Sequence, residues 1–240
     1  MANLYKITFK VISLTYDLYY LTDLIFAKKM KIQRYNKLFT VLTKYGFEDI
    51  LATSQLQKII PNSFLKKHPD TQKSLSFTKY ERIRMVLEEL GPTYVKLGQI
   101  FSNREDILPP DLIKELQKLQ DHVAVVKNFD IIKVVEEELK TPISANFNTI
   151  DITPIAAGSL AQVYSAVLIT GEKVVLKIQR PNIKTIIEAD ILVMKQIAEN
   201  LLKYSTLAKS FQPLEIVASF EKSIKEELQF LREANNMKRF

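Results

Sequence analysis

The chain has 240 residues and a formal net charge of +7, and 47% of its residues are apolar. That apolar fraction allows a packed core and excludes global disorder. The sequence has no cysteine, which excludes disulfides, thiolate chemistry and a cysteine-based zinc site. Its two histidines, His68 and His122, have no histidine or carboxylate at ligand spacing, so we predict no metal site in this chain.

The positive charge is concentrated at the N-terminal end of the chain. Residues 1–45 hold eight Lys and Arg and two Asp, a net charge of +6, so the remaining residues sum to only +1. No base-reading or stacking motif accompanies this basic segment. We therefore expect no nucleic-acid partner.

Residues 4–30 carry a stripe of aliphatic residues in steps of three and four, with the basic run "KKMK" at its end. This spacing predicts an amphipathic helix. The stripe consists of Ile7, Val11, Leu14, Leu18, Leu21 and Ile25. Two interpretations stay open, a helix lying in a membrane surface with a basic collar and a helix docked on the rest of the protein. Asp17 and Asp23 interrupt the segment, and it lacks a small-residue cleavage site, so we expect neither a spanning helix nor a signal peptide.

The following part of the chain reads as helices separated by proline, glycine and capping residues, with loop and a short helix in residues 50–77. Gly91 and Pro92 separate two of these helices. Asp111 is the predicted N-cap of the next helix, and Asn128 can cap the last one. The predicted helices are 33–45, 78–90, 92–102, 111–121 and 129–140.

Residues 141–180 are rich in β-branched residues and predict strands. The stretches "AQVYSAVLI" and "EKVVLKIQ" flank a turn at Thr170-Gly171 and predict an antiparallel hairpin. Strand alternation places Val175, Lys177 and Gln179 on one face of the second strand.

Two long helices, 182–204 and 213–239, are predicted to follow, with a break at Pro213. We therefore predict an α+β fold in three segments. They are a helical N-terminal segment (1–77), a helical extension (78–140) and a unit that contains the sheet (141–240).

A loop of small residues precedes the hairpin and consists of Ala156, Ala157, Gly158 and Ser159. Small residues let backbone N–H groups approach a phosphate closely, and Lys177 beneath such a loop can pair with phosphate oxygens. A solvent-facing lysine beside a tight turn is the alternative. A kinase-type lobe also pairs this lysine with a helix glutamate, and spacing alone does not choose among Glu226, Glu227 and Glu233.

Four motifs occur in one order along the chain: "KLGQ" (96–99), "PIAAGSLAQVYSA" (154–166), "VVLKIQRP" (174–181) and "ELQFLREANN" (227–236). In these motifs the sequence resembles the UbiB/AarF/ADCK family of atypical protein-kinase-like proteins, which is linked to ubiquinone and other isoprenoid-quinone metabolism. The resemblance covers about residues 33–240. It implies a protein-kinase-like small lobe, with a short antiparallel sheet and helices, behind a helical extension that carries a "KxGQ" motif.

The resemblance also implies roles for single residues. Lys177 matches the nucleotide-binding lysine of the family, and Glu233 in "REAN" matches its helix partner. The loop from Ala156 to Ser159 matches the alanine-rich loop that replaces the glycine-rich loop of ordinary kinases, and Val163 belongs with these nucleotide-binding residues. ATP or ADP with Mg²⁺ is the cofactor that such a site implies.

Lys96, Gly98 and Gln99 match the "KxGQ" signature, which in the family lies on a helix over the active site and obstructs protein substrates. Lys96 and Gln99 are three residues apart and are expected to project from one helical face. We expect Gly98 to let this helix sit close to the nucleotide lobe. The alternative is that the glycine serves packing and Lys96 is solvated.

The sequence departs from the family pattern in two places. Glu227 and Gln229 stand where the family has Glu-x-Asp, so a carboxylate is replaced by an amide, which puts full activity in doubt. After Lys177 the chain has no His, no Gly and a single Asp, Asp190. We therefore predict no catalytic residue in this chain. We expect the catalytic aspartate and the metal loop beyond Phe240, in a longer protein, and a truncated gene is the alternative.

Two functions follow as hypotheses. One is an ATP-binding atypical kinase or ATPase that supports ubiquinone biosynthesis, of which this chain is an N-terminal fragment. The other is a non-catalytic, pseudokinase-like or membrane-surface adaptor. The expected partners are a nucleotide and, for the adaptor, an anionic membrane surface or the proteins and lipids of quinone biosynthesis. The expected location is the cytoplasm, at the inner face of the membrane if the N-terminal helix binds lipid.

Overall fold

The computed structural model describes residues 28–47, 69–120, 125–126, 130–204 and 210–230. The predicted amphipathic helix of residues 4–30 therefore lies almost wholly outside the described residues, as do His68, His122 and Glu233. Residues 28–44 are helical. The elements that follow are α3 (Thr71–Ser74), α4 (Lys79–Leu90), α5 (Pro92–Phe101), α6 (Pro110–Gln117), η3 (Lys118–Gln120), α7 (Ile131–Leu139), η4 (Ile143–Ala145), β1 (Phe147–Ile150), β2 (Ala156–Ala157), β3 (Ala161–Leu168), β4 (Lys173–Gln179), α8 (Ile183–Tyr204) and α9 (Pro213–Glu227).

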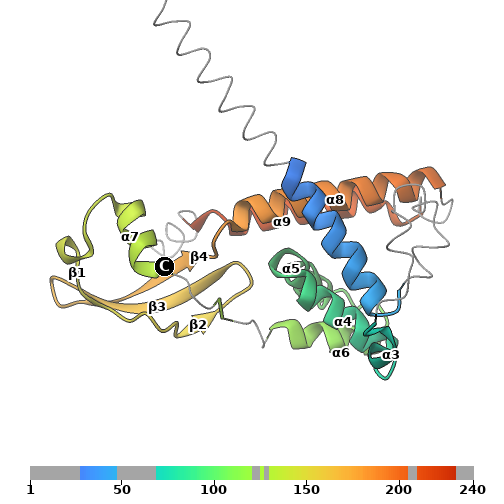
Figure 1. Ribbon diagram of the computed structural model, residues 1–240, viewed down its shortest axis with the longest axis horizontal. Helices are drawn as coiled ribbons and strands as arrows, with labels where there is room; N and C mark the ends of the chain where they lie inside the picture. The colour runs from blue at the N-terminus through green and yellow to red at the C-terminus, as the bar shows by residue number, and fades with distance from the viewer. Residues whose placement is uncertain (1–27, 48–68, 121–124, 127–129, 205–209, 231–240) are drawn as a thin grey trace, which may run out of the picture.

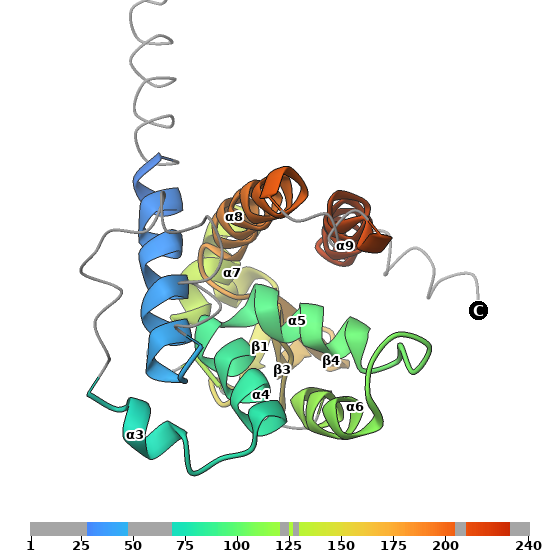
Figure 2. The ribbon, with the colours of Figure 1, turned by 90° about the vertical axis from the view of Figure 1, so that its right-hand side faces the viewer.

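A small sheet with helix α7 lies beside a larger group of helices (Figure 1). The sheet has four antiparallel strands, in which β3 pairs with β4 on one side and with β1 and β2 on the other. In Figures 1 and 2, α5 lies between α8 and α9 on one side and α4 and α6 on the other. This mixture of helices and a small antiparallel sheet confirms the predicted α+β class.

The predicted hairpin forms from β3 and β4, and its two faces differ in burial. On β4, the side chains of Val174, Leu176 and Ile178 pack against a cluster that includes Ile131 and Val135 of α7. The alternate residues Val175 and Lys177 are exposed. One face of the sheet is thus covered by α7, and the lysine lies on the opposite face.

The helical part has a core of its own. This core joins side chains from the helix of residues 28–44 with others from α4, α5, α8 and α9, and Leu90, Ile187 and Ile224 are almost completely buried in it. The two long C-terminal helices therefore pack on the helical extension, whereas the sheet packs on α7. Within the described part of the chain, no helix combines the length and apolarity needed to cross a membrane.

A buried ion pair connects three helices inside this core. The Arg34 guanidinium donates to both carboxylate oxygens of Asp190 on α8, with Nε–Oδ1 and Nη2–Oδ2 distances of 2.5 and 2.9 Å. Arg34 Nη2 also donates to the Leu90 carbonyl at 2.8 Å, and Lys37 Nζ donates to the same oxygen at 3.2 Å. The Asp190 side chain is fully buried, and this burial raises its pKa, while the hydrogen bonds from Arg34 act in the opposite direction. The pair fixes where α4 ends relative to α8.

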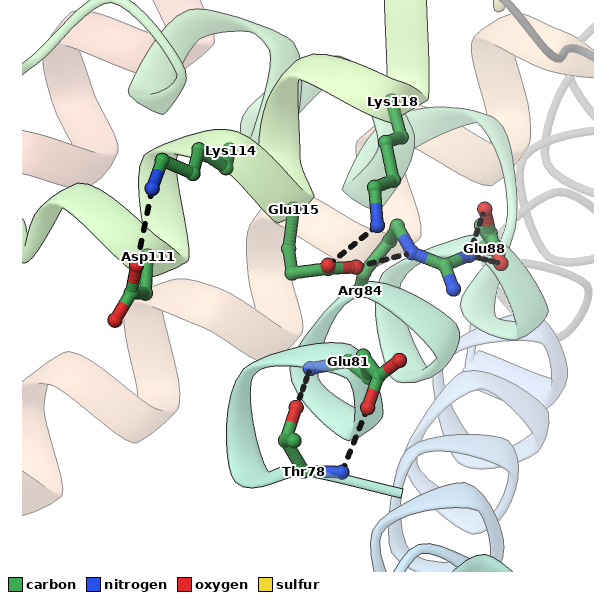
Figure 3. Close-up of polar contacts among 8 residues, drawn as sticks. All are labelled: Thr78, Glu81, Arg84, Glu88, Asp111, Lys114, Glu115 and Lys118. Atoms are coloured by element: carbon green, nitrogen blue, oxygen red, sulfur yellow. Dashed lines mark hydrogen bonds and ion pairs between the residues drawn. The ribbon is translucent and has the colours of Figure 1, made fainter.

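Helix α4 has a defined start and a defined end. At its start, Thr78 Oγ1 accepts from the Glu81 N–H, and Glu81 Oε2 accepts from the Thr78 N–H, which is a capping box (Figure 3). At its end, Gly91 has a φ of +104°, a conformation that favours glycine, and Pro92 then begins α5. The predicted break at Gly91-Pro92 is confirmed.

Arg84 joins α4 to α6 on the outer side of the helical group. Its guanidinium donates to Glu88 at 2.7 Å and to Glu115 of α6 at 2.9 Å, and Lys118 also pairs with Glu115 (Figure 3). The Glu115 side chain is only 13% exposed, and Lys118 and Arg84 hold its pKa below the usual value despite this burial. These ion pairs hold α6 against α4. Both helices lie on the side of α5 that faces away from α8 and α9 (Figures 1 and 2).

Three predicted helix starts are wrong. The helix predicted to begin at residue 33 is already helical at residue 28 and runs without a break to residue 44. Asp111 lies in the first turn of α6 and is not its N-cap, because Pro110 occupies the first helical position, where proline needs no N–H partner. Asp130, and not Asn128, caps α7 by accepting from the Lys133 N–H at 3.1 Å.

The end of the last helix is also wrong in the prediction. Helix α9 ends at Glu227, twelve residues before the predicted end at residue 239, with Leu228 as its C-cap, and Phe230 is again helical. The sequence "EELQFLREANN" contains neither glycine nor proline, so nothing in it signals this stop. At this end the Leu228 carbonyl accepts a hydrogen bond from Gln179 of β4, at the candidate site.

We expect Asp190→Ala to lower the free energy of unfolding by about 3–5 kcal/mol, because it leaves the Arg34 charge buried without its partner. The double change Arg34→Met with Asp190→Leu should recover most of this loss, since it removes both charges. Urea unfolding followed by circular dichroism measures both. Asp106→Ala, which breaks an exposed pair with Arg104, is the matched control and should leave the midpoint nearly unchanged. A double variant no more stable than Asp190→Ala would contradict the role of the pair.

Candidate functional site

The candidate site is built on the exposed face of β4, at Lys177. Lys177 lies opposite Val163 of β3, and Val163 lies opposite Ala156 of β2, so the three residues form one row across three strands. The Lys177 Nζ lies 4.7 Å from the centre of the Phe230 ring, a cation–π contact. The row therefore brings the predicted lysine, the predicted valine and the start of the small-residue loop together.

The small-residue loop is held from the end of β4. Arg180 donates through Nε and Nη2 to the Gly158 carbonyl, at 3.1 and 2.9 Å. The Arg180 N–H donates to the Leu160 carbonyl, and the Gly158 N–H donates to the Ala161 carbonyl. Partial burial lowers the pKa of the Arg180 guanidinium below its usual value. Because Arg180 follows Lys177 by three residues, one strand positions both the lysine and the loop.

Helix α5 reaches the same region through Lys96. The Lys96 ammonium pairs with Glu227 Oε2, on the last residue of α9, at 2.6 Å. The two side chains are 21% and 36% exposed, so this is a half-exposed ion pair. The interpretation of Lys96 as a solvated lysine is therefore wrong, and α5 is tied directly to the end of α9.

Gln99 does not share the contact that Lys96 makes. Its Nε2 donates to the Leu119 carbonyl of η3 at 2.9 Å, whereas Lys96 pairs with α9. The two polar residues of the motif thus connect α5 to different neighbours. Their predicted regulatory role stays a prediction.

Gly98 faces the helical group and not the sheet. A Cβ at this position would lie 2.4 Å from Leu119 Cδ1 and 2.9 Å from Leu87 Cδ1, both closer than real Cβ contacts. The expectation that Gly98 allows a close approach to the nucleotide lobe is therefore wrong. The glycine is explained by packing against α4 and η3.

The end of α9 meets β4 at two further points. Gln179 Nε2 donates to the Leu228 carbonyl at 2.8 Å, and Phe230 carries the ring over Lys177. Neither Gln179 nor Phe230 was singled out for a role by the sequence. The signal was present for Gln179, since strand alternation places it on the face of Lys177, but the contact of Phe230 depends on where α9 ends.

The three candidate glutamates have different surroundings. Glu227 pairs with Lys96, Glu226 is exposed, and Glu233 lies outside the described residues. Gln229, at the position of the family aspartate, is exposed beside Glu227. The assignment of Glu233 as the partner of Lys177 therefore stays a prediction.

A hollow of about 840 Å³ opens on the sheet towards the turn of the hairpin. It is lined by Thr149, Ile150, Asp151, Ser165, Ala166, Val167, Lys173, Val174 and Val175. Lys177 and the loop of residues 156–159 are not among these residues, so we place the candidate site at Lys177 and not in the hollow. Among the described residues, no group of three or more acidic or histidine side chains could hold a metal ion.

Gly98→Ala is expected to lower the free energy of unfolding by about 1–3 kcal/mol, because the added methyl group overpacks the contact with two leucines. Combining it with Leu119→Val should cost less than the sum of the two single changes, since valine withdraws the closest methyl group. Thermal and urea unfolding measure this coupling. Gly158→Ala is the matched control, because its Cβ would meet its nearest neighbour, the Ala161 carbonyl, at an ordinary 3.5 Å. Additive effects of Gly98→Ala and Leu119→Val would contradict the packing explanation.

For the ion pair between α5 and α9, we expect a coupling free energy of about 0.2–1 kcal/mol in a double-mutant cycle of Lys96→Ala and Glu227→Ala. The reversal Lys96→Glu with Glu227→Lys should restore the coupling that each single reversal loses. Unfolding at low and high salt measures it, because an attraction between half-exposed charges weakens with ionic strength. A coupling of zero at low salt would show that the contact contributes nothing to the position of α5.

Comparison with known proteins gives the family. Residues 118–240 match the ABC1 atypical kinase-like domain. The chain is 35% identical over 216 residues to a protein of Pseudomonas fluorescens named "Probable protein kinase UbiB", across 87% of this chain and 40% of that protein. Proteins of the same name are 37% identical in Marinobacter nauticus, over 208 residues, and 35% identical in Vibrio cholerae, over 214 residues.

The matches cover most of this chain but less than half of each relative. These matches include 86–87% of this chain but only 38–40% of the relatives, so the chain spans about two-fifths of their length. The domain match covers more than half of the chain and includes the whole sheet, α8 and α9. Together with the identities to the named proteins, it shows that the chain belongs to the UbiB family of ABC1 atypical kinase-like proteins.

Proposed function

We propose that this chain is the nucleotide-binding part of a UbiB-type atypical kinase or ATPase. The observation that carries the proposal is the row of Ala156, Val163 and Lys177 across the sheet, with the exposed lysine beside a loop that Arg180 holds. In kinase-type small lobes a strand lysine in this position pairs with the phosphate oxygens of the nucleotide. We assign that role to Lys177.

The loop fits a phosphate group that approaches closely. The nearest atom to a Cβ on Gly158 would be the Ala161 carbonyl oxygen at 3.5 Å, so there is room beside this residue. Ala156, Ala157 and Ser159 would offer their backbone N–H groups to the phosphate oxygens. Val163, in the same row as Lys177, would contact the apolar part of the nucleotide.

Magnesium would accompany ATP or ADP and neutralise charge on the phosphate groups. We assign it no ligand among the described residues of this chain. Glu233 is the proposed partner of the Lys177 ammonium, and Glu227 and Gln229 flank the site at the end of α9. The relatives are named as UbiB kinases, and we propose by that likeness a role in isoprenoid-quinone biosynthesis for the protein.

Helix α5, with Lys96, Gly98 and Gln99, is proposed to restrict access to the nucleotide. Its contact with α9 through Glu227 supports a location beside the site. A non-catalytic adaptor at a membrane surface is the second candidate. It is favoured by Gln229, which supplies no charge where the family has a carboxylate.

The test uses the protein expressed from its complete open reading frame, titrated with MgATP and MgADP in a calorimeter. Lys177→Ala should weaken binding at least about tenfold, because hydrogen bonds to charged groups contribute about 1.5–3 kcal/mol. Lys133→Ala is the matched control. It removes the same charge from an exposed position on α7, on the covered side of the sheet, and should leave the affinity unchanged. Equal affinities of the wild type and Lys177→Ala would overturn the nucleotide assignment and favour the adaptor.

A further inference from the structure

Two side chains of β4 make a paired contact with the end of α9. Lys177 and Gln179 are two residues apart and project from the same face of β4. Their partners, Phe230 and Leu228, are also two residues apart. The strand and the segment after α9 are thus joined at two matched points.

The Gln179 contact holds the backbone at the end of α9. The last carbonyl groups of a helix have no partner within the helix. Gln179 Nε2 supplies a partner to one of them, the Leu228 carbonyl, at 2.8 Å in a part-buried position. The Leu228 side chain also packs against the helical core, so the backbone there is held from two directions. Phe230 follows this fixed point by only two residues.

The Phe230 contact acts on the lysine itself. The ring centre lies 4.7 Å from the Lys177 Nζ, within the range in which an aromatic face attracts an ammonium group. A lysine side chain is long and flexible, and fixing its direction on binding costs conformational entropy. A ring already in contact with the ammonium reduces the number of directions that the side chain samples before a ligand arrives.

We infer that Phe230 and Gln179 are positioning residues that hold the Lys177 ammonium towards the phosphate groups of the nucleotide. Gln179 places the segment that carries Phe230, and Phe230 directs the lysine. This inference rests on the proposed nucleotide-binding function. A positioning role can be distinguished from a purely structural role. When either residue is replaced, only the part of the affinity that depends on the phosphate groups should change.

The experiment measures the affinities of ATP and of adenosine for the protein from the complete open reading frame, by competition against a fluorescent nucleotide. Phe230→Leu, which keeps an apolar side chain but removes the ring, should weaken ATP binding about two- to fivefold. Gln179→Ala should weaken it by a similar factor, and Phe230→Tyr should retain the wild-type affinity. Adenosine binding should be the same in all variants. Phe211→Leu is the matched control, because Phe211 is an exposed phenylalanine at the α8–α9 connection.

Lys177→Ala separates the two proposals. If it leaves ATP affinity unchanged, the proposed function fails and this inference fails with it. If it weakens ATP binding while Phe230→Leu and Gln179→Ala match the wild type, only the positioning roles are overturned. They are overturned as well if Phe230→Tyr is as weak as Phe230→Leu, or if adenosine binding falls by the same factor as ATP binding. Thermal unfolding of each variant confirms that it is folded at the temperature of the assay.

Discussion

The buried ion pair of Arg34 and Asp190 is the constraint on which the arrangement of the helices depends. Two charges removed from water are tolerated only when each satisfies the other, so the helix of residues 28–44 and α8 have one relative position. The same guanidinium binds the Leu90 carbonyl at the end of α4. Since Gly91 and Pro92 follow directly, the pair also determines where α5 starts, and with it how far Lys96 reaches towards α9.

The end of α9 contacts both the helical group and the sheet. Glu227 faces the helical group through Lys96, while Leu228 and Phe230 face the sheet through Gln179 and Lys177. Three of the four residues from Glu227 to Phe230 therefore carry these contacts, one to the helical group and two to the sheet. A movement of α5 or of β4 would displace this one segment. Through it, the position of α5 can influence the position of the Lys177 side chain.

Much of the fold could be predicted from local signals, because those signals have local causes. The alternation of side chains along β4 predicted which residues share the face of Lys177, and the Gly-Pro pair predicted the start of α5. The wrong predictions concern positions where a contact between residues far apart in the sequence determines the structure. The end of α9 is bonded to Gln179, which is 49 residues from Leu228 in the sequence, and the reason for Gly98 lies in Leu87 and Leu119. The family motifs predicted roles for Lys177 and Lys96, which stay predictions, but could not show that Lys96 pairs with Glu227.

Helix α5 is held differently on its two sides, and the difference has a consequence for its response to the environment. Towards α4 and η3 it makes apolar contacts around Gly98, which ions in solution do not weaken. Towards α9 it combines apolar contacts in the shared core with a half-exposed ion pair, which mobile ions screen over about 8–10 Å at physiological salt. Ionic strength can therefore weaken the hold on this side only in part, so that at high salt Lys96 and Glu227 would separate while α5 stays packed in the core.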